Sequence, residues 1–195
     1  MTMKEKMLKE LYRYNKAESS YHVDITLDSY RDVYSEWDYS PFTNRDLDDD
    51  LLDYLMECSY EIGTRRNLVI SFHLPQELKD EKKEMRSIEG FRHYFSYRIR
   101  KLKGEQVRQI RNTLMLTVIG VLLLVFAYFL EEAVPVDFFS KTIVEGLYIG
   151  AWVALWEIFT IWFFSITQLN YMLKHYRRLQ KVVIEYIYRK LEGMQ

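Results

Sequence analysis

The sequence predicts an α+β fold, in which a small cytosolic α/β domain precedes a two-helix transmembrane hairpin that is extended by cytosolic stalk helices. The main observation is that residues 112–130 contain no charged side chain and residues 143–167 contain two, although the 195-residue chain is 28% charged. A helix needs about 20 apolar residues to cross a bilayer. In addition, two segments before these runs have the composition of strands.

The basic residues near the apolar runs predict how the hairpin is oriented. They lie before the first run and after the second, and they are Arg98, Arg100, Lys101, Lys103, Arg108, Arg111, Lys174, Arg177, Arg178 and Lys181. The linker 131–142 contains one lysine, three acids and Pro135, which stops a helix. Because basic residues accumulate on the cytoplasmic side, both termini are expected in the cytoplasm and these bases at the membrane surface.

Two segments of the cytosolic part are predicted to be strands. Residues 21–27 alternate between polar and apolar side chains, and residues 67–74 are rich in β-formers. Two strands alone make a poor sheet. A third strand is therefore expected either from residues 29–36 or from a neighbouring subunit.

Helical spacing predicts the elements between and after these strands. A helix capped by Asn44 or Asp46 should end at Gly63, which tolerates positive φ. A long helix should begin at about Gln76. These boundaries divide the chain into an N-terminal amphipathic helix (1–16), a cytosolic α+β domain (17–84), a basic juxtamembrane helix (85–111), transmembrane helices 112–130 and 143–167, an external loop (131–142) and a cytosolic C-terminal helix (168–195).

The segments that flank the two apolar runs share a second pattern. Apolar residues recur every three or four positions over residues 85–102 and again over residues 169–186. Such seams require a helical partner. They predict a stalk from about residue 85 to residue 187, with Gly104 as its one break, although each seam could instead pack on the globular domain.

Small and polar residues mark one face of the predicted membrane helices. Gly146, Gly150 and Ala154 on the second helix and Gly120 on the first would let helix backbones approach closely, within the hairpin or between copies. Glu157 lies near the middle of its helix, where a carboxylate is unfavourable unless it is neutralised, paired or hydrated. It could form an ion site or line a pore, or it could hold helices together with Thr117 or Thr160 as partner.

Charge and motifs exclude several classes of protein. Residues 17–62 contain 13 acids and two bases, whereas the bases gather beside the apolar runs, which disfavours nucleic-acid binding. A single cysteine, Cys58, argues against a disulfide framework. No catalytic, cofactor or metal-binding motif is recognised, and no cofactor is expected.

Four stretches of sequence resemble an uncharacterised family of bacterial two-pass membrane proteins. They are residues 41–62, the tripeptide His73–Pro75, the segment YFSYRIRKL and residues 150–159. The resemblance implies an architecture and a bacterial inner membrane. It implies no activity and transfers no site residues.

Together these patterns favour a non-enzymatic protein that acts as a membrane-anchored, self-associating interaction or regulatory module. Its expected partners are the lipid bilayer and other copies of itself, and an unidentified cytosolic protein is a further candidate. One alternative is an oligomeric ion channel or membrane-perturbing effector that uses Glu157. A weaker alternative is a membrane-tethered enzyme of unrecognised type.

Overall fold

The computed structural model describes residues 3–41, 43–133 and 137–189. Its contacts divide these residues into two compact units. Unit 1 comprises the described residues within Met1–Arg100 and Leu173–Gln195, and unit 2 comprises those within Lys101–Met172. The predicted helix stop at Pro135 lies outside the described residues.

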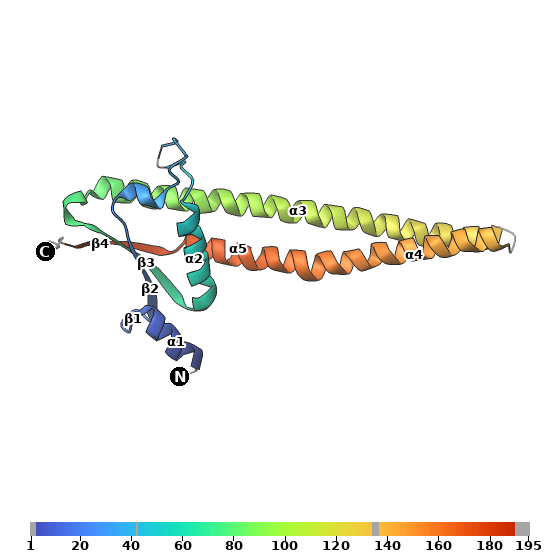
Figure 1. Ribbon diagram of the computed structural model, residues 1–195, viewed down its shortest axis with the longest axis horizontal. Helices are drawn as coiled ribbons and strands as arrows, with labels where there is room; N and C mark the ends of the chain where they lie inside the picture. Colours follow the sequence, from blue (N-terminus) through green and yellow to red (C-terminus); the bar gives the residue numbers. More distant parts are fainter. Residues whose placement is uncertain (1–2, 42, 134–136, 190–195) are drawn as a thin grey trace. The chain divides into compact units, whose positions relative to one another are not determined.

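Unit 1 is built on a four-stranded sheet in the order β1-β2-β3-β4 (Figure 1). The strand β1 (Arg13–Asn15) is antiparallel to β2 (Ser20–Thr26), whereas β2, β3 (Asn67–Pro75) and β4 (Val183–Arg189) run parallel. The model is therefore α+β, as predicted.

Helices cover one face of this sheet. Parallel neighbours need crossovers, and these are nearly always right-handed. Because both crossovers move the same way across the sheet, α2 (Asp49–Ile62), α3 (Glu81–Ala133) and α5 (Thr167–Gln180) place their unit 1 residues on the same side. Contacts agree with this arrangement: Ser59 of α2 bonds His175 of α5 at 2.7 Å, and the rings of Phe95 in α3 and Tyr176 in α5 lie 5.6 Å apart.

The helix α2 shows how local chemistry sets the boundaries of an element. Its N-cap is Asp48, whose carboxylate accepts a hydrogen bond from the Leu51 amide at 3.0 Å. The predicted cap at Asn44 or Asp46 is wrong. Leu47, which follows these residues, forms an isolated β-bridge with Tyr34, so the helix cannot begin before Asp48. The predicted end at Gly63 is confirmed, with a φ of 75°.

The expected C-terminal helix 168–195 is wrong beyond Gln180. The helix α5 ends there, and Val183–Arg189 forms β4, which pairs with β3. This segment has helical spacing and also the β-branched and aromatic composition of a strand. Main-chain pairing along β3 decides between the two, so the stalk does not reach residue 187. Residues 190–195 lie outside the described part of the chain.

The sources of the additional strands also differ from expectation. Residues 29–36 are not a strand, since Tyr30–Val33 forms the 3₁₀ turn η1 behind a capping box of Ser29 and Asp32. The N-terminal helix α1 (Met3–Leu11) is shorter than predicted, and β1 follows it. The sheet thus gains its edges from β1 and β4, which belong to the same chain.

Unit 2 contains the two apolar runs. The helix α3 continues from unit 1 through Gly104, so the expected break is absent, and it starts at Glu81 after the short 3₁₀ turn η2 (Gln76–Leu78) rather than at Gln76. The second run is formed by α4 (Phe138–Thr160), the π-helical segment η3 (Ile161–Ile166) and the start of α5. Both helical stretches are long and apolar enough to cross a membrane.

The glycine at the end of α2 yields a test of the fold. Gly63 has φ 75° and ψ 151°, a region that side chains with a Cβ avoid at a cost of about 1–3 kcal/mol. We expect Gly63→Ala to lower the opening free energy of unit 1 by that amount, measured by hydrogen exchange of the β3 amides. The control is Gly104→Ala, which has open space around the new Cβ and should leave β3 protection unchanged. Unchanged β3 protection in Gly63→Ala would contradict the assignment.

Candidate functional site

Glu157, the residue singled out in the second apolar run, lies on the exposed surface of α4. Neither predicted threonine partner reaches it. The hydroxyl of Thr117 donates to the Thr113 carbonyl at 2.8 Å, and that of Thr160 donates to the Trp156 carbonyl at 3.2 Å. Such bonds to the carbonyl four residues earlier are the usual alternative for a helical threonine. Among the described residues, the Glu157 carboxylate forms no hydrogen bond or ion pair, and neither threonine is its partner within one chain.

The small residues of the predicted packing face divide into two sets. A Cβ on Gly120 would lie 3.4 Å from the Ala154 Cβ, and Ala151 and Ala154 are buried, so these residues let α3 and α4 approach closely. A Cβ on Gly146 or Gly150 would meet nothing within 4 Å. Gly120 and Ala154 thus lie where α3 and α4 approach each other, whereas for Gly146 and Gly150 the other expectation, packing between copies, stays a prediction.

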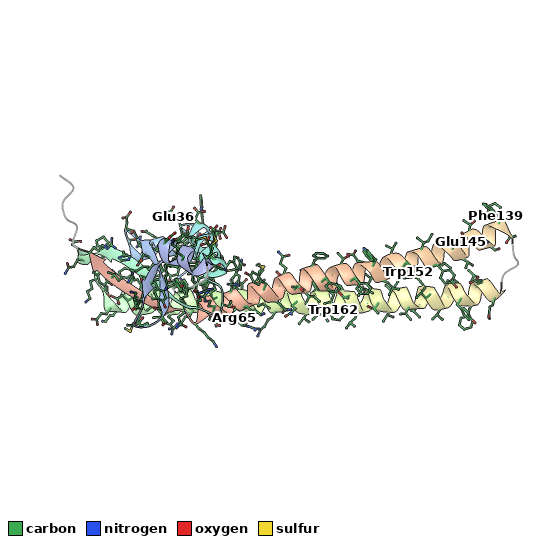
Figure 2. The ribbon with its side chains drawn as sticks, turned by 90° about the horizontal axis from the view of Figure 1, so that it is seen from below. Glu36, Arg65, Phe139, Glu145, Trp152 and Trp162 are labelled. Carbon is green, nitrogen blue, oxygen red and sulfur yellow. The ribbon has the colours of Figure 1, made fainter. Side chains whose placement is uncertain are left out.

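The two helices of unit 2 are joined by polar contacts near both ends of the apolar runs. Gln106 donates to Asn170 at 2.9 Å, and the Tyr148 hydroxyl donates to Glu131 at 3.0 Å. Bulky aromatic side chains cover other parts of their surface. Trp152 and Trp162, both labelled in Figure 2, are 66% and 64% exposed.

Two of the ten predicted membrane-surface bases are only partly exposed and bond to groups of unit 1. Arg98 lies over the rings of Tyr94 and Tyr176, and its guanidinium donates to the Tyr176 hydroxyl at 3.4 Å. Arg178 is half-buried and donates to the Ser59 carbonyl at 3.1 Å. The side chains of these two bases are thus engaged within the protein. The other eight are exposed and are Arg100, Lys101, Lys103, Arg108, Arg111, Lys174, Arg177 and Lys181.

The sheet face without crossover helices carries a network of polar side chains that was not predicted. Arg13 of β1 holds Asp24 of β2 through two bonds, from Nε at 3.0 Å and from an Nη at 2.8 Å. The same carboxylate lies 2.8 Å from Nε2 of His73 on β3. Asp24 and His73 are thus brought together by the parallel register of β2 and β3.

A second histidine continues this network. His22 contacts Ser71 through Nδ1 at 3.1 Å and Ser20 through Nε2 at 3.2 Å, and Arg13 also donates to Ser71 at 3.0 Å. Glu185 of β4 lies 3.7 Å from His22 Nδ1. The members on each strand are two residues apart, so they lie on one face of the sheet. This alternation is present in the sequence, but it brings these residues together only once the strand register is known.

The electrostatics of this network favour a structural role. The hydrogen bonds from Arg13 hold the pKa of Asp24 at about 2, against the opposing effect of burial, and the bond from His73 acts in the same direction. Ser71 is fully buried beneath Arg13, so its hydroxyl is not accessible as a nucleophile. Among the described residues, Nδ1 of His73 is buried without a hydrogen-bond partner. The arrangement joins all four strands but leaves no open position for a substrate at Ser71.

Comparison with known proteins assigns no function to the helices of unit 2 or to the polar face of the sheet. No protein-family model, no curated protein and no solved structure matches this chain. Any function therefore has to be argued from the residues of the chain itself.

The Arg13–Asp24–His73 contacts predict how acid affects unit 1. The pKa of Asp24 lies below its usual unfolded value of about 3.9, so its stabilising contribution is present above that value and is lost as the pH falls toward 2. We expect Asp24→Asn to destabilise unit 1 by about 1 kcal/mol at pH 7, because the partly exposed pair is screened by water. The variant should also show a smaller loss of stability between pH 6 and pH 3.

The measurement is hydrogen exchange of β3 amides at both pH values. Asp28→Asn is the matched control, because Asp28 is exposed and its side chain lies outside the network. Equal acid sensitivity of wild type and Asp24→Asn would contradict the assigned role.

Proposed function

We propose that this chain is an integral membrane protein whose two apolar helices anchor unit 1 and associate with other copies, forming a membrane-anchored interaction or regulatory module. The observation that carries the proposal is the surface of unit 2. In the most apolar 18-residue stretch of each candidate membrane helix, only 11% of the residues are buried. A core helix of a soluble protein would be mostly buried, and a secretion signal would lie near the N-terminus. A bilayer is the environment that covers such a surface.

The distribution of charge supports an orientation. The eight exposed bases lie on the N-terminal side of the first apolar run and the C-terminal side of the second. The positive-inside rule then assigns unit 1 and both termini to the cytoplasm. The resemblance to bacterial two-pass membrane proteins agrees with a bacterial inner membrane, where anionic lipids would attract the same bases.

Self-association rests on one stripe of α4. Gly146, Gly150 and Glu157 are exposed, and their spacing of four and seven residues puts them on one side of the helix. Lipid cannot solvate a carboxylate at the middle of a span, so Glu157 needs cover from protein or water. A second copy of the stripe supplies it: the glycines allow close approach, and two carboxyl groups can share a proton and hydrogen-bond to each other.

A channel is the second candidate function, favoured by the π-helical segment that follows Glu157. The π turns Ile161–Ile166 begin one helical turn after this residue, and such turns occur frequently at functional sites. Copies arranged around an axis would place a ring of Glu157 carboxylates in a water-filled pathway. Association is common to both candidates, whereas conduction belongs only to the second.

The stripe predicts how substitutions change the oligomeric state. We expect the wild-type chain to be an oligomer in lipid nanodiscs, measured by mass photometry. Gly150→Leu should weaken association by about tenfold or more, because a leucine side chain separates the two backbones. Trp152→Leu is the matched control, since Trp152 is similarly exposed but lies about 200° around the helix from Gly150.

A wild-type monomer at all protein-to-lipid ratios would contradict self-association. An equal effect of Gly150→Leu and Trp152→Leu would remove the stripe as its cause.

Ion flux separates the two candidates. If Glu157 lines a pathway, the wild type should conduct cations in liposomes, and Glu157→Gln should reduce the flux several-fold while the oligomer persists. If Glu157 serves association alone, the wild type should not conduct, and Glu157→Gln should change only the dissociation constant. Flux is measured with a potential-sensitive dye, with Glu145→Gln as the control near the end of the apolar run.

A further inference from the structure

A hollow of ≈ 410 Å³ lies in unit 1 at the edge of the sheet where its parallel strands begin. Pockets of this size accommodate small molecules. The walls come from three segments that are distant in sequence: the approach to β2, the α2–β3 loop and the turn between α5 and β4. The charged side chains among the lining residues are Glu18, Arg66, Arg177, Arg178 and Lys181.

The charge of this hollow is not compensated within the described residues. Four cations line it against one carboxylate, that of Glu18, which leaves a net charge of +3. None of the four cations takes part in an ion pair among the described residues. The contrast with the polar sheet face is sharp, because there Arg13 is matched by Asp24 at 2.8 Å.

Helix capping explains two of these cations but not the other two. Arg178 donates to the Ser59 and Arg66 carbonyls at 3.1 and 2.6 Å, and Arg66 donates to the Ile62 carbonyl at 3.0 Å. These bonds satisfy the C-terminal end of α2 and the loop after it, where cations are favourable. Arg177 and Lys181 form no such bonds in the described residues. Both are exposed, and both line the same hollow.

The guanidinium of Arg178, which lines the hollow, has a fixed orientation. Its two bonds to carbonyls set its orientation, and burial lowers its pKa to about 10, so it remains charged at neutral pH. Ser20 also lines the hollow, but its hydroxyl is already engaged, 3.3 Å from the Glu18 carboxylate and 3.2 Å from Nε2 of His22. An anion that enters therefore meets one oriented planar cation, Arg178, and two exposed cations, Arg177 and Lys181.

We propose that this hollow binds a phosphate group, carried by a small phosphorylated molecule or by a lipid headgroup. Guanidinium groups recognise phosphate oxygens in pairs, and lysine adds a mobile point charge. A long polyanion such as nucleic acid is disfavoured, because residues 17–62 of the same unit carry 13 acids against two bases. The site is independent of the proposed self-association, since every lining residue belongs to unit 1.

The test uses the full chain in nanodiscs of pure phosphatidylcholine at pH 7. Inorganic phosphate is titrated against sodium chloride of equal ionic strength, and hydrogen exchange is followed at residues 64–69 and 177–183. Phosphate should protect these amides and chloride should not. Arg177→Gln/Lys181→Gln should weaken the apparent affinity at least about tenfold, as expected for lost charge-assisted hydrogen bonds. This variant leaves Arg178 and the α2 end intact.

A matched variant and a lipid arm complete the test. Arg92→Gln/Arg100→Gln removes two exposed charges of unit 1 outside the hollow and should leave the affinity unchanged. Replacing phosphatidylcholine by phosphatidylglycerol without added phosphate distinguishes the sources: protection at the same residues assigns a lipid headgroup, and protection by phosphate alone assigns a soluble ligand. Protection by neither, or equal losses in the two double variants, would overturn the proposal.

Discussion

The pairing of β3 on both of its edges is the constraint on which the rest of the structure depends. On one side it takes β2, and on the other side it takes β4, which the chain reaches only after both apolar helices. Parallel strands cannot be joined by a tight turn, so the chain has to return to the starting end of the sheet each time. The first return contains the turn η1 and the helix α2. The second return contains the whole of unit 2, which is thus an insertion within a βαβ-type connection.

This constraint also explains the two kinds of charge in unit 1. Along the strands, the register places Arg13, Asp24 and His73 side by side, so the polar groups on the face without crossover helices satisfy one another. At the starting edge of the sheet, the same register gathers the ends of two helical connections. Arg178 and Arg66 bond main-chain carbonyls there, and among the described residues the one carboxylate of the hollow, Glu18, forms no ion pair with any of its four cations.

Features set by local chemistry could be predicted, and those set by distant partners could not. Gly63 ends α2 because the positive φ at this position favours glycine, and the composition of residues 67–74 is that of a strand. The segment 183–189 fits a helix and a strand equally well, and pairing with β3 decides between them. The close approach at Gly120 was predictable from residue size, but residue size does not say which side of α4 faces α3, so packing within the hairpin and packing between copies could not be distinguished for Gly146 and Gly150.

The late position of β4 also has a consequence for synthesis of the protein on the ribosome. When β3 has emerged, its outer edge has no partner, and it stays open until residues 76–189 have been translated. At 5–20 residues per second this takes about 6–23 s. An open strand edge is a template for pairing with other chains. The edge of β3 is therefore open to pairing with other chains until the last strand closes the sheet.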